Sequence, residues 1–488
     1  MPVINRETTV STPTLANAYI WTALASGVKY FFGFGISMLL ARLLTPADYG
    51  LIGMVLVFTG FLSAIQESGL AQAIVYFKDD EHTLLSTHHT VNLFAGIVLT
   101  ATLAAAAPLI AGFYNMPALS LVTQVMGVTF LLNGLRSVSQ NLMTKQFRFR
   151  ELAVIETVSV FSAAAVAIAM AAAGFGVWSL VTNMLLAAAI QTGLILAKQP
   201  LTWTFHPDWP CVKRIFRWGL PLTGSNMAWK MYDSSDYLII GKVLGEQPLG
   251  IYTMAFRLAT LVNDKIGSVV SRVSFASFAS MQDAREQAVQ HWHTLTETLT
   301  LITFPILVAI AVNAEDLIVL ALGAKWSETI LPLQILCGVG AVKSLTPMTN
   351  NMLSGLGRTD LRFKFTLVNL AVLPLSFWAG AYINGIIGVS WAWIISFPPI
   401  SAWLTYLAVR QTRSSVRGYL RALQFPVITS FACFITMWIA GALLPQGVLR
   451  LSLRSGTGIA CYLICLFMHT RSRERMLAAL TNIRSRFA

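Results

Sequence analysis

Charged side chains interrupt segments that are otherwise long and apolar. Six of them are basic: Lys29, Arg136, Lys230, Arg257, Lys265 and Lys343. A charge at the centre of a bilayer costs at least about 2.5–3.5 kcal/mol on insertion scales, so it usually faces a cavity or a partner. Both basic residue types bind phosphate groups, lysine as a mobile point charge. We therefore expect a polyanion to bind at five candidate cavity cations: Lys29, Lys230, Arg257, Arg136 and Lys343.

Lys29 and Lys230 form the most specific pair. Each lies near the middle of an apolar segment, and a shift of 200 residues superimposes them to within one position. Lysines at equivalent places in two halves of a protein would face each other across a central cavity. The alternative is structural, because Asp233 lies three residues after Lys230 on the same helical face and could pair with it.

The remaining bases have structural explanations as well. Arg257 and Asp264 are seven residues apart on one helical face, so a helix-packing pair explains them as well as a substrate role does. Arg136 and Lys343 lie toward the ends of their segments, where a long side chain can reach the membrane surface. Lys265 is similar.

Five acids also fall in apolar segments: Glu67, Glu156, Asp233, Asp236 and Asp264. Buried carboxylates take part in proton and ion pathways. Asp236 has no basic residue within one helical turn, so it is the leading candidate for coupling to H+ or Na+, ahead of Asp233 and Glu67. The alternative is a hydrogen-bonded polar residue near the outer mouth of a channel.

Metal and nucleotide chemistry lack the patterns that they need. The five cysteines have no metal spacing, and His82, His88 and His89 would need a further ligand. The nucleotide-binding pattern Gly-x-x-x-x-Gly-Lys-Ser/Thr is absent. We expect no metal and no cofactor.

The composition indicates a polytopic membrane protein. Of 488 residues, 56% are hydrophobic and 11% are charged, and the mean hydropathy is +0.66. A soluble fold of this length could not bury that much apolar surface. We predict an all-α chain of about fourteen membrane-spanning helices, near residues 15–40, 50–74, 88–112, 118–141, 152–173, 176–197, 217–241, 249–273, 294–314, 328–350, 363–384, 386–409, 421–444 and 447–469.

The basic residues predict the orientation. With a cytoplasmic N-terminus, 23 of the 34 Lys and Arg residues fall on the cytoplasmic side. The outer loops receive five: Arg42, Lys242, Lys325, Arg450 and Arg454. Cytoplasmic loops collect Lys and Arg, so both termini are predicted to be cytoplasmic. The arginines between 471 and 486 are typical of an anchor on anionic lipid rather than of a nucleic-acid site.

An internal repeat divides the chain. Residues 38–44 (MLLARLL) align with 238–244 (LIIGKVL) at a shift of 200, and later matches pair Asn141 with Asn351 and Gly176 with Gly388. A repeat of six helices keeps both copies in one orientation, and transporters with repeats place the substrate between them. We predict an N-terminal six-helix lobe (1–200), a second six-helix lobe (201–412), and two extra helices with a basic cytoplasmic tail (413–488).

Several motifs resemble one family of transporters. They are residues 41–50 (ARLLTPADYG), 67–70 (ESGL), 110–114 (IAGFY), 145–153 (KQFRFRELA) and 174–181 (GFGVWSLV). In this order and spacing they resemble the Wzx-type polysaccharide and O-antigen flippases, in the colanic-acid and exopolysaccharide branch of the multidrug/oligosaccharidyl-lipid/polysaccharide (MOP) exporter superfamily. The likeness is dense through the first 200 residues.

The resemblance implies a function and a fold. Members carry undecaprenyl-pyrophosphate-linked oligosaccharide across the bacterial inner membrane for surface polysaccharide synthesis, with two lobes around a central cavity. It implies a transporter rather than an enzyme, working with glycosyltransferases, a polymerase and membrane lipids. Trp229, Trp391 and Trp393 are then candidates for stacking on sugars, with packing as their default role.

Three other functions are weighed against this one. Flipping of the peptidoglycan precursor is the closest of them, and only the resemblance separates it from the flipping of a polysaccharide unit. A cation-coupled antiporter of the multidrug type shares the fold, but would favour acids over bases in its cavity. A membrane polysaccharide polymerase or ligase would need catalytic residues on sizeable outer loops, and no outer loop reaches about 25 residues.

Overall fold

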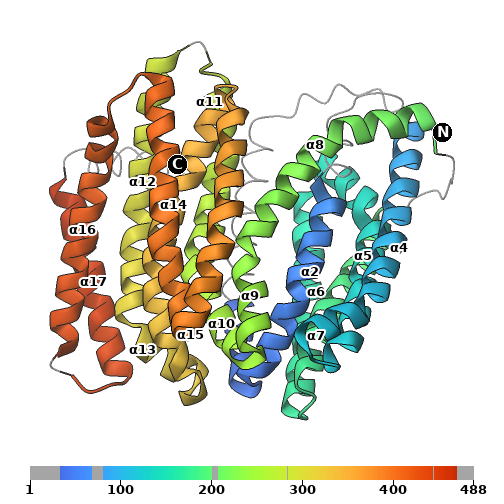
Figure 1. Ribbon diagram of the computed structural model, residues 1–488, viewed down its shortest axis with the longest axis horizontal. Coiled ribbons are helices and arrows are strands. Elements are labelled where there is room, and N and C mark those ends of the chain that lie inside the picture. The colour runs from blue at the N-terminus through green and yellow to red at the C-terminus, as the bar shows by residue number, and fades with distance from the viewer. Residues whose placement is uncertain (1–32, 69–80, 201–206, 283, 443, 470–488) are drawn as a thin grey trace, which may run out of the picture. The chain divides into compact units, whose positions relative to one another are not determined.

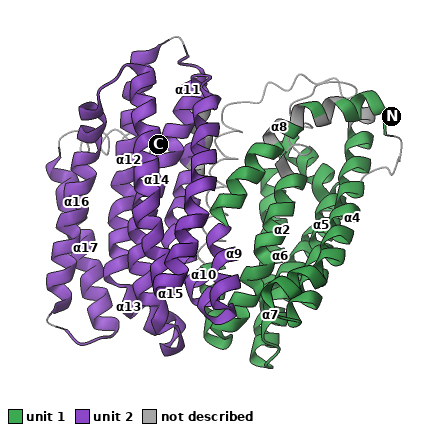
Figure 2. Ribbon diagram, in the orientation of Figure 1, with its two compact units in different colours: residues 1–234 green, residues 235–488 purple. Residues whose placement is uncertain are grey.

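The computed structural model describes residues 33–68, 81–200, 207–282, 284–442 and 444–469. Within these ranges every regular element is a helix, and 10 helices are long and apolar enough to cross a membrane. The chain is therefore an all-α, multi-pass membrane protein. It forms two compact units, residues 1–234 and 235–488, which Figure 2 colours separately. The total of fourteen spans and the lobe boundaries stay predictions.

Unit 1 contains a short helix over residues 33–43 and six longer helices (Figure 1). These are α2 (Pro46–Ser68), α4 (Glu81–Tyr114), α5 (Ala118–Lys145), α6 (Phe149–Ala172), α7 (Val177–Lys198) and α8 (Trp209–Asp233). At the crossing of α4 and α5 a Cβ on Gly96 would lie 2.7 Å from the Phe130 carbonyl oxygen, and one on Gly134 would lie 2.6 Å from that of Asn92. Backbone contact this close requires glycine.

Local hydrogen bonds and a proline explain why the chain breaks before α2. The backbone N–H and the hydroxyl of Thr45 donate hydrogen bonds to Asp48 Oδ2, at 2.9 and 2.7 Å. Pro46 then starts the helix, where its missing N–H costs nothing, and Asp48 lies in the first turn, where the helix dipole favours a carboxylate.

Unit 2 holds the remaining helices. They are α9 (Ser235–Leu244), α10 (Glu246–Val262), the π-helical turn η1 (Asn263–Gly267), α11 (Ser268–Ala279), α12 (Arg285–Val312), α13 (Ala314–Leu317), the short turns η2 (Ile318–Leu322) and η3 (Ala324–Thr329), α14 (Ile330–Gly355), α15 (Thr359–Thr412), α16 (Val416–Ala442) and α17 (Val448–Met468). Two spans predicted as continuous are interrupted. The segment 217–241 breaks at Ser234, and the segment 249–273 contains η1, where the Asn263 side chain donates to the Gly340 carbonyl oxygen at 2.7 Å.

The 54-residue α15 is two helices joined at a kink. Asn384 and Gly385 have non-helical dihedral angles, and the φ of Gly385 is +53°. The kink lies at the boundary between the predicted spans 363–384 and 386–409. The two arms meet at Gly380 and Gly388, because a Cβ on Gly380 would lie 2.5 Å from the Gly388 carbonyl oxygen.

Matching turns support the internal repeat. After α5, the N–H of Arg148 donates to Met143 O at 3.0 Å and that of Phe147 to Thr144 O at 3.0 Å. After α14, Arg358 donates to Leu353 O at 2.8 Å and Gly357 to Ser354 O at 3.1 Å. Both are Schellman turns with a positive φ, +57° at Phe147 and +76° at Gly357.

The turns also correct the register of the repeat. Gly176 (φ +54°) precedes α7 just as Gly385 (φ +53°) precedes the second arm of α15. The backbone therefore pairs Gly176 with Gly385, three residues before the Gly388 that the sequence alignment suggested. The offset of 209 residues from Gly176 to Gly385 then lies one residue from the offset of 210 shared by the Schellman turns and by Asn141 with Asn351.

Candidate functional site

Unit 2 contains a fully buried carboxylate in its first helix, α9. Asp236, in the first turn of α9, is 0% exposed, as are Tyr252 of α10 and Trp393 of α15. The Tyr252 hydroxyl donates to Asp236 Oδ2 at 2.7 Å, and the Trp393 indole N–H donates to the same oxygen at 3.0 Å. The Tyr237 backbone N–H donates to Oδ1 at 2.9 Å. Elements far apart in the sequence thus supply the donors that a buried acid requires.

The same indole contacts a cation through its face. Lys343 Nζ, from α14, lies 4.4 Å from the Trp393 ring centroid and 4.9 Å from that of Phe256. Both distances are within the range of cation–π attraction. Phe377 also packs against the Trp393 ring, with the two ring centroids 4.9 Å apart. We call Asp236, Tyr252, Trp393 and Lys343 the unit 2 charge cluster.

This arrangement couples the position of an acid to that of a base. Trp393 connects them, because its N–H edge bonds the carboxylate while its π system holds the ammonium. The indole N–H also lies 3.0 Å from the Tyr252 oxygen. If Asp236 took up a proton or bound a cation, the hydrogen bonds from Tyr252 and Trp393 would have to rearrange. Direct contacts therefore connect the carboxylate of Asp236 to the ammonium of Lys343 through the Trp393 ring.

Two of the candidate cavity cations, Lys230 and Arg136, lie in the described part of unit 1 and have different neighbours. Lys230, in α8, is half-buried, and its Cε lies 2.8 Å from where a Cβ would be on Gly60 of α2. Its Nζ lies 5.9 Å from the centroid of the adjacent Trp229 ring. Arg136 of α5 donates a hydrogen bond to the side chain of Gln191 on α7. Lys29 lies outside the described residues, so the predicted pairing of Lys29 with Lys230 stays a prediction.

The other predicted residues are dispersed. Arg257 on α10 and Lys265 in η1 are exposed, and Asp264 accepts a hydrogen bond from Thr260 at 3.4 Å. Asp233 is half-buried at the end of α8. The side chain of Glu67 lies outside the described part. Trp393 is buried in the charge cluster, so packing and hydrogen bonding account for it, whereas Trp229 and Trp391 are 47% and 48% exposed.

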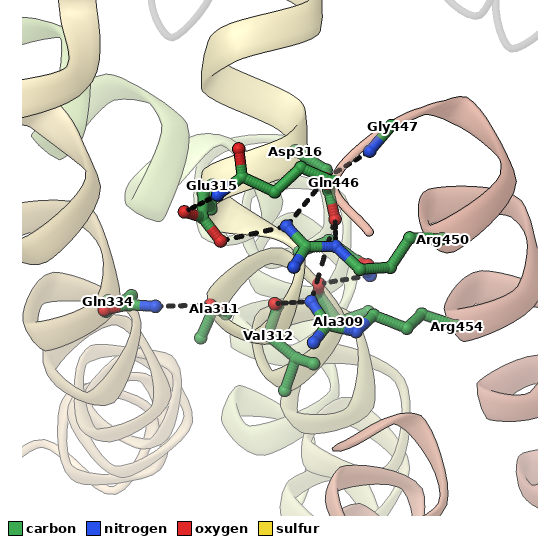
Figure 3. Close-up of polar contacts among 11 residues, drawn as sticks. Ala309, Ala311, Val312, Glu315, Asp316, Gln334, Gln446, Gly447, Arg450 and Arg454 are labelled. Atoms are coloured by element: carbon green, nitrogen blue, oxygen red, sulfur yellow. Dashed lines mark hydrogen bonds and ion pairs between the residues drawn. The ribbon is translucent and has the colours of Figure 1, made fainter. Parts of the chain in front are cut away.

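One cluster was missed by the sequence analysis (Figure 3). Arg450, at the start of α17, donates two hydrogen bonds to Asp316 of α13, at 2.7 and 2.8 Å, and one to Glu315 at 2.9 Å. The side chains of Arg450 and Asp316 are 10% and 1% exposed. Arg454 donates to Val312 O at 3.0 Å and lies 3.7 Å from Asp316. Both arginines were assigned to an outer loop, yet they lie in α17 and bind it to α13.

The sequence contained a signal for this second cluster. Two arginines four residues apart at the start of an apolar helix share a face, and an adjacent pair of acids follows an earlier span. Among the described residues, no group of three or more His, Cys, Asp or Glu side chains is arranged to hold a metal ion.

Comparison with known sequences identifies relatives over nearly the whole chain. Residues 39–331 match the family described as polysaccharide biosynthesis protein. The chain is 24% identical over 428 residues to the lipopolysaccharide biosynthesis protein WzxC of Escherichia coli K12, covering 87% of each protein. It is 26% identical to the teichuronic acid biosynthesis protein TuaB of Bacillus subtilis 168, covering 88% of this chain and 90% of TuaB. It is 24% identical to the succinoglycan biosynthesis transport protein ExoT of Rhizobium meliloti 1021, covering 98% of this chain and 97% of ExoT.

Solved structures share the fold. The lipid II flippase MurJ, in an inward closed conformation, matches with a TM-score of 0.73 at 13% identity, over 93% of this chain and 99% of MurJ. An inward-facing multidrug resistance transporter of the MATE family, in the MOP superfamily, matches with a TM-score of 0.66 at 15% identity, over 81% of this chain and 98% of that one. At these identities the likeness concerns the fold alone.

Proposed function

Because the chain belongs to the polysaccharide biosynthesis protein family, we propose that it is a flippase for lipid-linked oligosaccharides. Its substrate is the undecaprenyl-pyrophosphate-linked repeat unit of a surface polysaccharide, carried from the inner to the outer leaflet of the inner membrane by alternating access. The relatives named for lipopolysaccharide, teichuronic acid and succinoglycan biosynthesis support this substrate class. Both termini are cytoplasmic in this proposal.

The broader assignment needs no proposal. The chain is a multi-pass membrane transporter of polysaccharide biosynthesis and is not an enzyme, as its whole-length relatives and its MOP-superfamily fold neighbours indicate. The resemblance seen in the sequence motifs is confirmed by the family match over residues 39–331.

The unit 2 charge cluster is the observation that carries the mechanism. A transporter without a nucleotide site needs another energy source, and a carboxylate that is 0% exposed inside apolar helices is suited to exchange a proton or a sodium ion. Asp236 is the coupling residue in this proposal. When it binds an ion, the bonds to Tyr252 and Trp393 rearrange, and the contact between Trp393 and Lys343 transmits that change to α14.

The substrate diphosphate is bound by basic side chains. Lys29 and Lys230 are the principal candidates, with Arg136, Lys343 and Arg257 as further ones. The half-buried Lys230 supports this role, because its stem packs along α2 at Gly60 while its charge stays near the ring of Trp229. Glycosyltransferases and a polymerase act before and after this step.

The test is transport in reconstituted vesicles. Purified protein is placed in liposomes containing a fluorescent undecaprenyl-diphosphate oligosaccharide, and a membrane-impermeant reagent measures its sidedness with and without an imposed pH or sodium gradient. We expect Asp236→Asn to abolish the response to the gradient. We expect Lys230→Ala to weaken flipping at least about tenfold, and Lys230→Arg to retain part of it.

Two outcomes would contradict the proposal. Absence of flipping by the unmodified protein, together with export of a cationic dye, would favour the multidrug-type antiporter, a reading that the acid at Asp236 and the MATE-like fold also accommodate. Unchanged gradient dependence in Asp236→Asn would remove Asp236 from the coupling step while leaving the substrate assignment intact.

A further inference from the structure

A polar pocket lies at one end of unit 2, beside the two helices that have no counterpart in unit 1. It has a volume of about 750 Å³ and is bounded by the first turns of α12 and α16 and by His469, the residue that follows α17. Residues at helical spacing on α12 form one wall: Gln290, His293, Thr294 and Glu297. A volume of this size is typical of a site for a small ligand.

The opposite wall, on α16, is cationic at one end and apolar at the other. Arg421 and Gln424 line the pocket with exposed side chains, and Phe425 and Ile428 continue the wall along the helix. The Phe425 ring stacks on His469 with centroids 3.9 Å apart. The pocket thus presents a charged part followed by an apolar part, as an amphipathic ligand requires.

His293 forms part of the α12 wall of this pocket. His293 Nε2 is buried, and within the described part of the chain nothing hydrogen-bonds to it. Gly418 makes room for the imidazole, because a Cβ there would lie 3.2 Å from His293 Cε1. Because Nε2 is buried away from the pocket surface, the polar groups that this wall offers to a ligand are those of Gln290, Thr294 and Glu297.

The charge around the pocket indicates an anionic ligand. Arg421 of α16 is the arginine that lines the pocket, and its side chain is exposed. Basic pockets between membrane helices bind the head groups of anionic lipids. The acyl chains of a lipid bound here would extend along α16, where they contact Phe425 and Ile428.

We propose that this pocket binds the head group of an anionic glycerophospholipid from the surrounding bilayer. Its phosphodiester accepts hydrogen bonds from Arg421, and the hydroxyls of a glycerol head group bond to Gln290 and Glu297. The acyl chains follow the apolar side chains of α16. This is a site for a bound membrane lipid, separate from the substrate cations, and it does not depend on the proposed flippase activity.

The test uses native mass spectrometry of the full chain in detergent, titrated with phosphatidylglycerol or phosphatidylcholine. We expect phosphatidylglycerol to bind more tightly, and Arg421→Gln to weaken it at least about tenfold, because a charge-assisted hydrogen bond is lost. Ala422→Phe, which fills the pocket without removing a charge, should have the same effect. Arg417→Gln is the matched control, one turn away and outside the pocket, and should change the affinity less than about twofold.

Each other outcome would overturn the proposal. Equal binding of both lipids would show that charge does not select the ligand. Equal affinity for phosphatidylglycerol in Arg421→Gln, Ala422→Phe and the control would place the lipid elsewhere. Tighter binding of undecaprenyl diphosphate than of phosphatidylglycerol, lost in Arg421→Gln, would assign the pocket to the transported lipid. Thermal unfolding of each variant verifies that it is folded.

Discussion

The turns after α5 and α14 have the same hydrogen bonds but different residues at the strained position. Unit 1 places Phe147 at a φ of +57°, whereas unit 2 places Gly357 at +76°. A left-handed backbone costs a residue with a Cβ about 1–2 kcal/mol and costs glycine little. The shared turn is therefore held by its helix-end bonds and the surrounding helices, and only unit 2 has the residue that adopts this conformation without strain.

Among the described residues, both units contain an exposed ion pair, and unit 2 also contains a buried one. Each turn is followed by an exposed pair, Arg148 with Glu151 at 2.7 Å and Arg358 with Asp360 at 2.9 Å. Hydrogen bonding to these acids raises the pKa of both guanidinium groups. Unit 2 adds the buried pair of Arg450 with Asp316. The exposed pairs shape a turn, whereas the buried pair attaches extra helices.

The largest effect is expected at the buried pair. Arg450→Met removes the nearest cation and two hydrogen bonds from the buried Asp316, which keeps the Arg454 contact at 3.7 Å and the Gly447 N–H bond at 3.2 Å. We expect this loss to destabilise unit 2 by about 3 kcal/mol. Thermal unfolding of the purified protein in detergent measures the change. Arg358→Met, at the exposed pair, is the matched control and should hardly move the midpoint. Equal shifts in both variants would show that burial does not distinguish these ion pairs.

A smaller effect is expected at the glycine turn. Gly357→Ala places a Cβ on a residue at positive φ, with no atom within 4 Å of it, so the cost comes from backbone strain alone. We expect a loss of about 1–2 kcal/mol, measured by the same unfolding experiment. Gly112→Ala, another open helical position without positive φ, should be neutral or stabilising. A neutral Gly357→Ala would mean that the turn relaxes in unit 2.

The smallest effect is expected at the phenylalanine turn. Phe147→Gly relieves the strain in unit 1, and because Phe147 is 52% exposed, little apolar burial is lost. The gain is limited to about 1 kcal/mol, since glycine also adds entropy to the unfolded chain. A raised unfolding midpoint would confirm the strain. A lowered midpoint would show that the contact of Phe147 with Phe149, at 6.0 Å between ring centroids, outweighs it.

Local signals predicted most of the fold. Apolar length located the helices, and Thr45-Pro46 and Gly385 marked breaks that the structure contains. The interruptions at Ser234 and at η1 were not predicted, although short polar stretches mark both places, residues 233–236 (DSSD) and 263–265 (NDK). The register of the repeat was off by three residues at Gly176, since a turn conformation, which hydropathy does not report, sets it.

Single members of the clusters could be singled out in the sequence, but which residues lie together could not be predicted from it. A charge in an apolar segment singled out Asp236 and Lys343 separately, and nothing local connected them. Their link is Trp393, which lies 157 positions after Asp236 and is reached only through the packing of α15 against α9. Arg450 was placed in a loop by its charge, because its partner Asp316 becomes apparent only in three dimensions.

The buried pair has a consequence for the order in which the protein is made. Arg450 follows Asp316 by 134 positions. At a synthesis rate of about 5–20 residues per second, the two acids of α13 exist for on the order of ten seconds before their guanidinium emerges from the ribosome. During that time α14 and α15 are synthesised, and Asp316 has no guanidinium from α17 to pair with. The contact closes only after α17 has been made, so it is a late event in the biogenesis of the chain.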